Sequence, residues 1–208
     1  NAYCVHHLYE DKQDYLIEIL MECKKAGNPD MVYKFSSTSK ISFPGSGIAA
    51  MAASDANLED IRSTMRVQTI GHDKVNQLRH VRFFGDIHGI VEHMKKHADI
   101  IKPKFEAVLS TFERMLAPYG VASWTKPTGG YFLSLNVQQG CAKRVYELAK
   151  EAGVTLTEAG ATFPYKHDPK DCNLRIAPTY PTVEEMETAS AVLCLCVRAA
   201  ALEKMNTK

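Results

Sequence analysis

The stretch FSSTSKISFP, residues 35–44, places one lysine directly after four hydroxyl side chains and ends on a proline. The apolar run Met31 to Phe35 before it is predicted to form a buried strand. Lys40 therefore follows a strand, at the position where α/β sheets bind ligands. The residue is either an ordinary solvated charge on a loop or a nucleophilic amine held among phosphate-binding hydroxyls.

Two kinds of lysine chemistry were compared for this stretch. Ser37 and Lys40 form the S-x-x-K of serine acyl-enzymes, and Lys126 to Gly129 (KPTG) resembles a degraded form of their K-T-G. That chemistry requires a helix that begins at the serine, and residues 43–47 (FPGSG) forbid a helix after Lys40. The other reading is a lysine that forms a Schiff base with pyridoxal phosphate, for which SSTSK provides a strand-to-loop junction and nearby hydroxyls.

The composition favours a small-molecule partner. The 208 residues are 45% hydrophobic and 24% charged, with a net charge of +1, as in soluble globular proteins. This charge balance gives no reason to expect binding to nucleic acid or to an anionic membrane. No apolar run approaches the length of a membrane span and no leader pattern opens the sequence, so the predicted location is cytoplasmic.

The cysteines and histidines do not predict a metal site. The six cysteines are scattered without a C-x-x-C pair, which favours reduced thiols. Cys4, His6 and His7 could be considered as ligands, but adjacent histidines on an extended segment point to opposite faces. No second ligand pair follows at zinc spacing.

The hydrophobic pattern predicts an α/β chain with two parts. In the first part, helices are expected over 15–23, ended by Gly27-Asn28-Pro29, and over 57–70, with a second strand within 45–53. A long helical stripe from Ile90 to Leu116 follows, and Pro103 should kink it. After Gly120, strands over 131–137 and 173–177, a helix over 142–149 and a last helix capped by Thr182 and Glu185 predict a smaller α+β unit.

The order of several motifs gives the sequence a family resemblance. The motifs are Tyr3, SSTSK (36–40), PTGGYF (127–132), EAGATFPY (158–165) and NLRIAP (173–178). Across essentially the whole chain this order resembles the C-terminal half of fold-type I, class I pyridoxal-phosphate aminotransferases, and most closely bacterial-type aspartate aminotransferases. The resemblance implies that residues 1–100 are the C-terminal part of the cofactor-binding large domain, with a mostly parallel sheet. Residues 101–208 would then be the small C-terminal domain.

The resemblance also assigns roles residue by residue. Lys40 matches the lysine that forms the Schiff base with pyridoxal 5'-phosphate and then moves a proton at the substrate α-carbon. Tyr3 matches the tyrosine that contacts the phenolic oxygen of the cofactor. Ser37, with Ser39 beside it, matches a phosphate ligand, and Arg175 matches the arginine that clamps the substrate α-carboxylate.

Two features depart from the family pattern. Many members carry a second phosphate-binding arginine in G-x-R-x-G, whereas this chain has Gly45-Ser46-Gly47-Ile48. The aspartate expected to pair with the pyridine nitrogen would fall just before Asn1, and the glycine-rich phosphate loop and the ring-stacking aromatic are also absent from these 208 residues. The chain, which opens on NAYCVHHL without a methionine, is therefore expected to be part of something longer.

The implied function is transamination of aspartate with 2-oxoglutarate by a homodimer that binds amino-acid and 2-oxo-acid substrates. A cation for the distal carboxylate is needed, and Lys74 to Arg82 (KVNQLRHVR) is a loose candidate that equally suits a basic helix face. The alternative is a non-catalytic pyridoxal-phosphate-binding domain of a transcription regulator. The upstream sequence would distinguish the two, because the regulator needs a DNA-binding module there.

Overall fold

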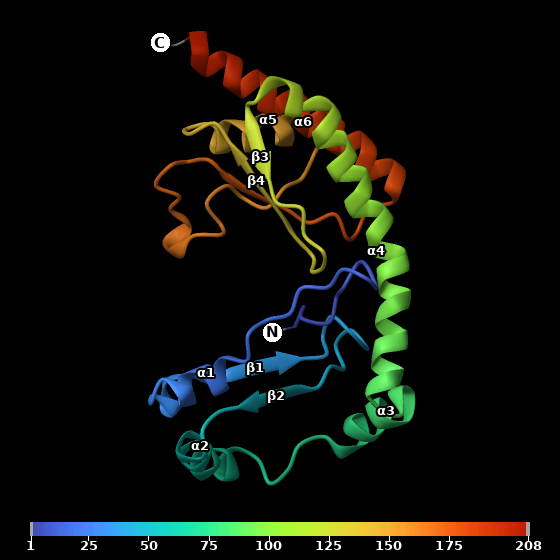
Figure 1. Ribbon diagram of the computed structural model, residues 1–208, viewed down its shortest axis with the longest axis vertical. Coiled ribbons are helices and arrows are strands. Elements are labelled where there is room, and N and C mark those ends of the chain that lie inside the picture. The colour runs from blue at the N-terminus through green and yellow to red at the C-terminus, as the bar shows by residue number, and fades with distance from the viewer. Residues whose placement is uncertain (1, 207–208) are drawn as a thin grey trace. The chain divides into compact units, whose positions relative to one another are not determined.

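The computed structural model describes residues 2–206. The chain divides into a first unit that extends to residue 97 and a second unit that starts at residue 98. Helix α4 (Ile87–Met115) begins in the first unit and ends in the second (Figure 1). It contains Pro103, and the kink expected there stays a prediction. Among the helices of residues 2–206, none combines the length and the hydropathy needed to span a bilayer.

The first unit contains the two-stranded sheet that leads to Lys40. Strands β1 (Lys34–Ser37) and β2 (Ala49–Ala52) pair antiparallel, with Phe35 opposite Met51 (Figure 1). These two strands therefore do not show the mostly parallel sheet that the resemblance implied. The connection between them, residues 38–48, carries the lysine.

The predicted strand over 31–35 is correct in type but wrong in position and burial. Pro29–Met31 form a 3₁₀ turn, because proline fixes φ near its helical value, and the strand starts only at Lys34. Phe35 is 62% exposed and Met31 74% exposed. A ribbon of two strands cannot bury both of its faces by itself, so these side chains remain uncovered in the first unit.

The helices of the first unit begin at side-chain caps. Helix α1 (Ile19–Lys25) starts where the Glu18 carboxylate accepts from the Met21 amide at 2.8 Å, so the predicted start at Tyr15 is wrong. Helix α2 (Asp55–Gln68) starts after Ser54 and agrees closely with the predicted range. Helix α3 (Lys74–Phe84) starts after Asp73 and was not predicted as an element of its own.

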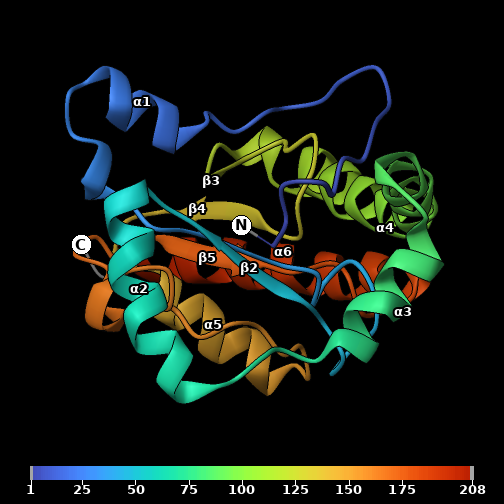
Figure 2. The same ribbon diagram turned by 90° about the horizontal axis from the view of Figure 1, so that it is seen from below.

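The second unit has a three-stranded antiparallel sheet packed on helices. The strands β3 (Ala122–Trp124), β4 (Leu133–Val137) and β5 (Asn173–Ile176) lie in the order β3-β4-β5. Helices α5 (Ala142–Glu151) and α6 (Val183–Asn206) pack on one another (Figure 2). Short 3₁₀ turns occupy Ala117–Tyr119 and Pro164–Lys166. Apart from β3, the strands and helices of this unit were predicted from the sequence.

The sheet of the second unit has one apolar and one polar face. Leu135 lies opposite Leu174, and both are almost completely buried. Side chains alternate along a strand, so Ser134 and Arg175, which also lie opposite one another, share the other face. The predicted capping box at the start of α6 is present, since the Thr182 amide donates to Glu185 Oε2 at 2.8 Å and the Glu185 amide donates to Thr182 Oγ1 at 3.2 Å.

Candidate functional site

Lys40 lies on a tight turn directly after β1. The amides of Ile41 and Ser42 both donate to the carbonyl of Thr38 at 2.9 Å. Thr38 is itself fixed to the far side of the connection, because its amide donates to Ile48 O at 2.8 Å and its Oγ1 accepts from the Ile48 amide at 2.8 Å. The sequence thus placed the lysine correctly, on a fixed turn at the end of a strand.

The side chains around this turn suit a reactive amine next to a phosphate. Lys40 is exposed, and within residues 2–206 its Nζ forms no salt bridge with a carboxylate. Ser37 is half-buried and Ser39 is exposed, and the Ser39 amide donates to Ser37 Oγ at 3.1 Å. The turn therefore combines a lysine that has no carboxylate partner in the described chain with two hydroxyls that can donate to an anion.

Histidines from distant parts of the first unit hold this turn. His6 Nε2 donates to the carbonyl of Lys40 at 2.8 Å, and His93 Nε2 donates to the carbonyl of Ile41 at 2.8 Å. A carbonyl oxygen can only accept, so both imidazoles carry a proton on Nε2.

A third histidine holds the hydroxyls of the same turn. His80 Nδ1 donates to the Asn76 carbonyl at 2.9 Å, so Nε2 can accept a hydrogen bond when it carries no proton. Ser42 Oγ lies 2.7 Å and Thr38 Oγ1 lies 3.2 Å from that nitrogen. The hydroxyls of Ser42 and Thr38 can therefore donate to His80.

Burial lowers the pKa of two of the histidines. His6 is only 3% exposed, and this desolvation lowers its pKa although hydrogen bonds to the carbonyls of Lys40 and Tyr3 oppose the shift. Burial also lowers the pKa of His97, with a further contribution from His93, whose Nε2 lies 3.1 Å from His97 Nε2. Protonation of His6 and His97 is therefore disfavoured in the folded chain.

We expect the first unit to lose stability as the pH falls below about 6.5, the ordinary pKa of histidine. The folded-state pKa values of His6 and His97 are lowered, so below 6.5 the unfolded chain binds more protons and the free energy of unfolding decreases. Well above 6.5 the imidazoles are neutral in both states and contribute no pH dependence. Denaturant titrations of the full-length protein between about pH 7.5 and 5.5 measure the effect, above the range in which carboxylates titrate. A His97→Gln variant should show a smaller decrease, and an unchanged slope would contradict the assignment.

Tyr3 lies in the same neighbourhood as the lysine turn. It belongs to the first turn of the chain, where the His6 amide donates to the Tyr3 carbonyl at 3.1 Å. The rings of Tyr3 and His6 have centroids 5.8 Å apart. Since His6 also binds the carbonyl of Lys40, the structure brings Tyr3, Ser37, Ser39 and Lys40 together in the first unit.

Arg175 belongs to the polar face of the sheet in the second unit. Its guanidinium lies 4.6 Å from the ring centroid of Phe132, and its Nε is buried with no hydrogen-bond partner in the described part of the chain. On the same face Asn173 Nδ2 donates to Ser134 Oγ and to Asn136 Oδ1, both at 2.8 Å. An arginine held by an aromatic ring, with a buried donor left over, suits a carboxylate that binds at two points.

The basic segment Lys74 to Arg82 forms most of α3. Part of it supports the Lys40 connection, since His80 is buried and Asn76 Nδ2 donates to the Ser46 carbonyl at 2.9 Å. The Arg79 guanidinium lies 5.9 Å from the ring centroid of Phe43. The proposed contact with a distal carboxylate stays a prediction.

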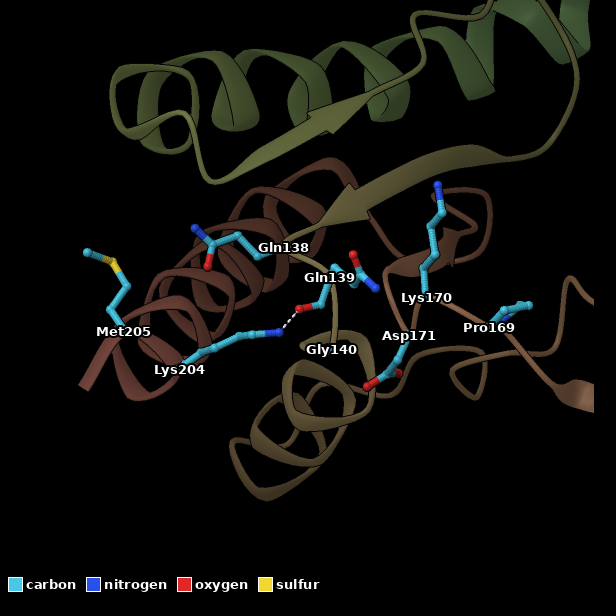
Figure 3. A pocket seen from close by; sticks show the side chains of 8 residues that line it. All are labelled: Gln138, Gln139, Gly140, Pro169, Lys170, Asp171, Lys204 and Met205. Carbon is cyan, nitrogen blue, oxygen red and sulfur yellow. Dashed lines mark hydrogen bonds between the residues drawn. The ribbon is translucent and has the colours of Figure 1, made fainter. Parts of the chain in front are cut away.

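The second unit also contains a hollow (Figure 3). It is lined by the loops 138–140 and 169–171 and by the end of α6. Lys204 Nζ donates to the Gln139 carbonyl there, which joins the last turn of α6 to the loop after β4. The Lys204 amine therefore stabilises the contact between α6 and this loop. None of the predicted site residues lines the hollow.

The histidines that hold the lysine turn could not be recognised from the sequence. The pattern around His6 suggests only a metal ligand, and within residues 2–206 no group of three or more His, Cys, Asp or Glu side chains is arranged to hold a metal. His93 and His97 are four positions apart and so share one face of α4, which is a readable signal for a paired role. His80 lies in the basic segment Lys74 to Arg82, whose charge pattern gives no sign of this contact.

Comparison with known proteins places the chain among aminotransferases. It is 46% identical over 203 residues to the aspartate aminotransferase of Corynebacterium glutamicum, covering 98% of this chain and 47% of the relative. The crystal structure of an aspartate transaminase from the same organism matches with a TM-score of 0.94 at 46% identity, over 98% of this chain and 48% of that one. An α-aminoadipate aminotransferase from Thermus thermophilus, complexed with N-(5'-phosphopyridoxyl)-L-leucine, shares the fold at 19% identity, with a TM-score of 0.76 over 97% of this chain and 50% of that one.

The family assignment is direct. Residues 1–208 match the aspartate amino-transferase family model, and the chain belongs to this family. The resemblance to aminotransferases and the α/β class are thereby confirmed. The chain spans about half the length of the relatives that it matches.

Proposed function

We propose that this chain is the C-terminal half of a pyridoxal-phosphate-dependent aminotransferase that transfers the amino group of aspartate to 2-oxoglutarate. The observation that carries the proposal is the turn of Lys40, where an exposed amine without a carboxylate partner in the described chain follows β1 next to the hydroxyls of Ser37 and Ser39. Family membership and the names of the Corynebacterium glutamicum relatives support the activity and the substrate.

Each residue has a defined task in this proposal. When bound, pyridoxal phosphate supplies an electron-withdrawing ring that stabilises negative charge at the substrate α-carbon. Lys40 Nζ attaches the cofactor and moves the proton at that carbon. The Tyr3 hydroxyl binds the phenolic oxygen, and the hydroxyls of Ser37 and Ser39 bind the phosphate.

The substrate and the rest of the phosphate need further groups. Arg175 binds the α-carboxylate of amino and oxo acids through its planar guanidinium. No arginine occurs in the segment Gly45 to Ile48, so the phosphate is held by hydroxyls of this chain together with groups outside it. The proposal includes a cytoplasmic homodimer. The regulator-domain alternative has no observation in its favour among the described residues.

The proposal is tested by locating the cofactor. The full-length protein is incubated with pyridoxal phosphate and reduced with borohydride, and the labelled peptide is identified by mass spectrometry. We expect the label on Lys40. The isolated 208-residue chain should label weakly and transaminate nothing, because the expected pyridine-nitrogen aspartate and the glycine-rich phosphate loop are not among these residues. Exposed apolar side chains such as Phe35, Leu16 and Ile17 should make the isolated chain aggregate. A label on another lysine, or an isolated chain that transaminates aspartate unaided, would contradict the proposal.

A further inference from the structure

We propose that His6 and His93 are positioning residues for Lys40, which fix the direction of its side chain by donating hydrogen bonds to two consecutive carbonyls. The inference rests on the proposed function, since it assumes that the Lys40 amine is the reacting group. The contacts that carry the inference are those of His6 with the Lys40 carbonyl and of His93 with the Ile41 carbonyl. Both act through the backbone of the turn.

The hydrogen bonds fix the peptide planes that follow Lys40 from both ends. In the plane between Lys40 and Ile41, the carbonyl accepts from His6 and the amide donates to Thr38 O. In the plane between Ile41 and Ser42, the carbonyl accepts from His93 and the amide again donates to Thr38 O. Because a peptide unit is planar, fixing both of its ends fixes ψ of the residue before it and φ of the residue after it.

Two earlier peptide planes are held as well. The Thr38 amide donates to Ile48 O, and the Ser39 amide donates to Ser37 Oγ at 3.1 Å. With planes held before Ser39 and after Lys40, chain continuity restricts the directions open to the Cα–Cβ bond of Lys40. Holding the amine of a long lysine side chain in one place costs conformational entropy, because most of its rotamers are lost. A restricted direction of the Cα–Cβ bond reduces this entropy cost.

The tautomers of the histidines are set by the surrounding groups. His93 Nε2–H faces both Ile41 O at 2.8 Å and His97 Nε2 at 3.1 Å. His97 must therefore present a bare nitrogen, with its own proton on Nδ1. The rings of Phe83 and Phe84 lie with centroids 5.3 and 5.4 Å from that of His93 and restrict its orientation.

His6 has a second consequence, because it links two of the proposed cofactor contacts. Its amide donates to the Tyr3 carbonyl and its Nε2 donates to the Lys40 carbonyl. The position of the Tyr3 backbone is thus coupled to that of Lys40 through one residue. We infer that losing the His6 donor changes cofactor capture by Lys40 more than it changes the overall fold.

The test replaces each histidine in the full-length protein by asparagine or by glutamine, whose side-chain amides differ in length. The amide nitrogen of glutamine can take the place of histidine Nε2, whereas that of asparagine reaches only the position of Nδ1. We measure the concentration of pyridoxal phosphate at which Lys40 is half-labelled after borohydride reduction. His6→Asn should raise it roughly 10- to 100-fold, as expected for a carbonyl left without its donor, and His6→Gln should stay within roughly threefold of wild type.

Matched controls and independent readouts complete the test. His93→Asn and His93→Gln should repeat the pattern, whereas His7→Asn and His88→Asn, neighbours that do not contact the turn carbonyls, should leave labelling unchanged. Nitrogen-15 NMR of the protein with isotope-labelled histidine should find protons on Nε2 of His6 and His93. Thermal unfolding of each variant checks that the fold is retained.

The outcomes separate the two proposals. Lys40 labelling in the wild type, with equal labelling of the asparagine and glutamine variants, would overturn the positioning role alone. A wild-type protein whose Lys40 is never labelled would contradict the proposed function and this inference with it. Equal loss in both variants, with the fold retained, would also overturn the role, since a packing contribution of the imidazole would then explain the effect.

Discussion

Lys40→Ala in the full-length protein is expected to abolish transamination of aspartate. Removing the proton-transfer group alone should lower the rate by roughly 10²- to 10⁴-fold, and the loss of the covalent attachment adds to this. Steady-state assays with aspartate and 2-oxoglutarate measure the effect. The variant should still bind pyridoxal phosphate noncovalently, because the hydroxyls of Ser37 and Ser39 remain.

A conservative variant separates charge from nucleophilicity at this position. Arginine keeps the positive charge but does not lose its proton in proteins, so Lys40→Arg should be as inactive as Lys40→Ala. Lys34→Ala is the matched control, since Lys34 lies on β1 and pairs with Glu18 at 2.7 Å, away from the turn. Turnover near the wild-type rate in either Lys40 variant would remove the central claim.

Arg175→Lys is expected to raise the KM for both amino and oxo acids by roughly 10- to 100-fold, because one charge-assisted hydrogen bond of a two-point contact is lost. Labelling of Lys40 by pyridoxal phosphate should be unchanged, since Arg175 is assigned to the substrate. Amines without a carboxylate should react at the wild-type rate. Initial-rate measurements over a range of both substrates test this.

The second unit offers a matched control for this substitution. Arg144 forms a two-point contact with Glu203, with Nε and Nη2 at 2.7 and 2.9 Å from the carboxylate oxygens, on the protein surface. Arg144→Lys removes the same geometry without touching the proposed site, so KM should not change. If Arg175→Lys instead prevented cofactor attachment to Lys40, the role of Arg175 would be wrong.

The sequence predicted the second unit better than the first, and the reason is burial. Strand β4 and helix α6 face a core of their own, and their apolar residues repeat with the period of the element that they form. In the first unit the run of Tyr15 to Ile17 is apolar yet exposed, so the pattern suggested a helix that does not form there. The start of α1 is set instead by the Glu18 cap, a local signal that the apolar pattern overrode.

The candidate site divides in a similar way. The position of Lys40 after a strand could be predicted from short-range order, whereas the roles of Lys40 and Ser37 came from the resemblance and stay predictions. The roles of His6 and His93 could not be predicted, because each depends on a contact with a carbonyl distant in sequence, and a carbonyl has no side-chain identity to read. Arg175 was predicted by resemblance, and its unpaired Nε adds a physical reason that the sequence alone does not contain.

The histidine contacts also set an order of events during folding. The hydrogen bonds to the Lys40 and Ile41 carbonyls close loops of 34 and 52 residues, so the lysine turn reaches its final form only after both ends of the first unit have docked. Closing such loops costs chain entropy before the stabilising contacts form. This step is therefore slower than local helix formation. In refolding experiments, attachment of the cofactor to Lys40 should therefore recover later than the helical circular dichroism signal. The absorbance of the attached cofactor would report when the last contacts of the turn form.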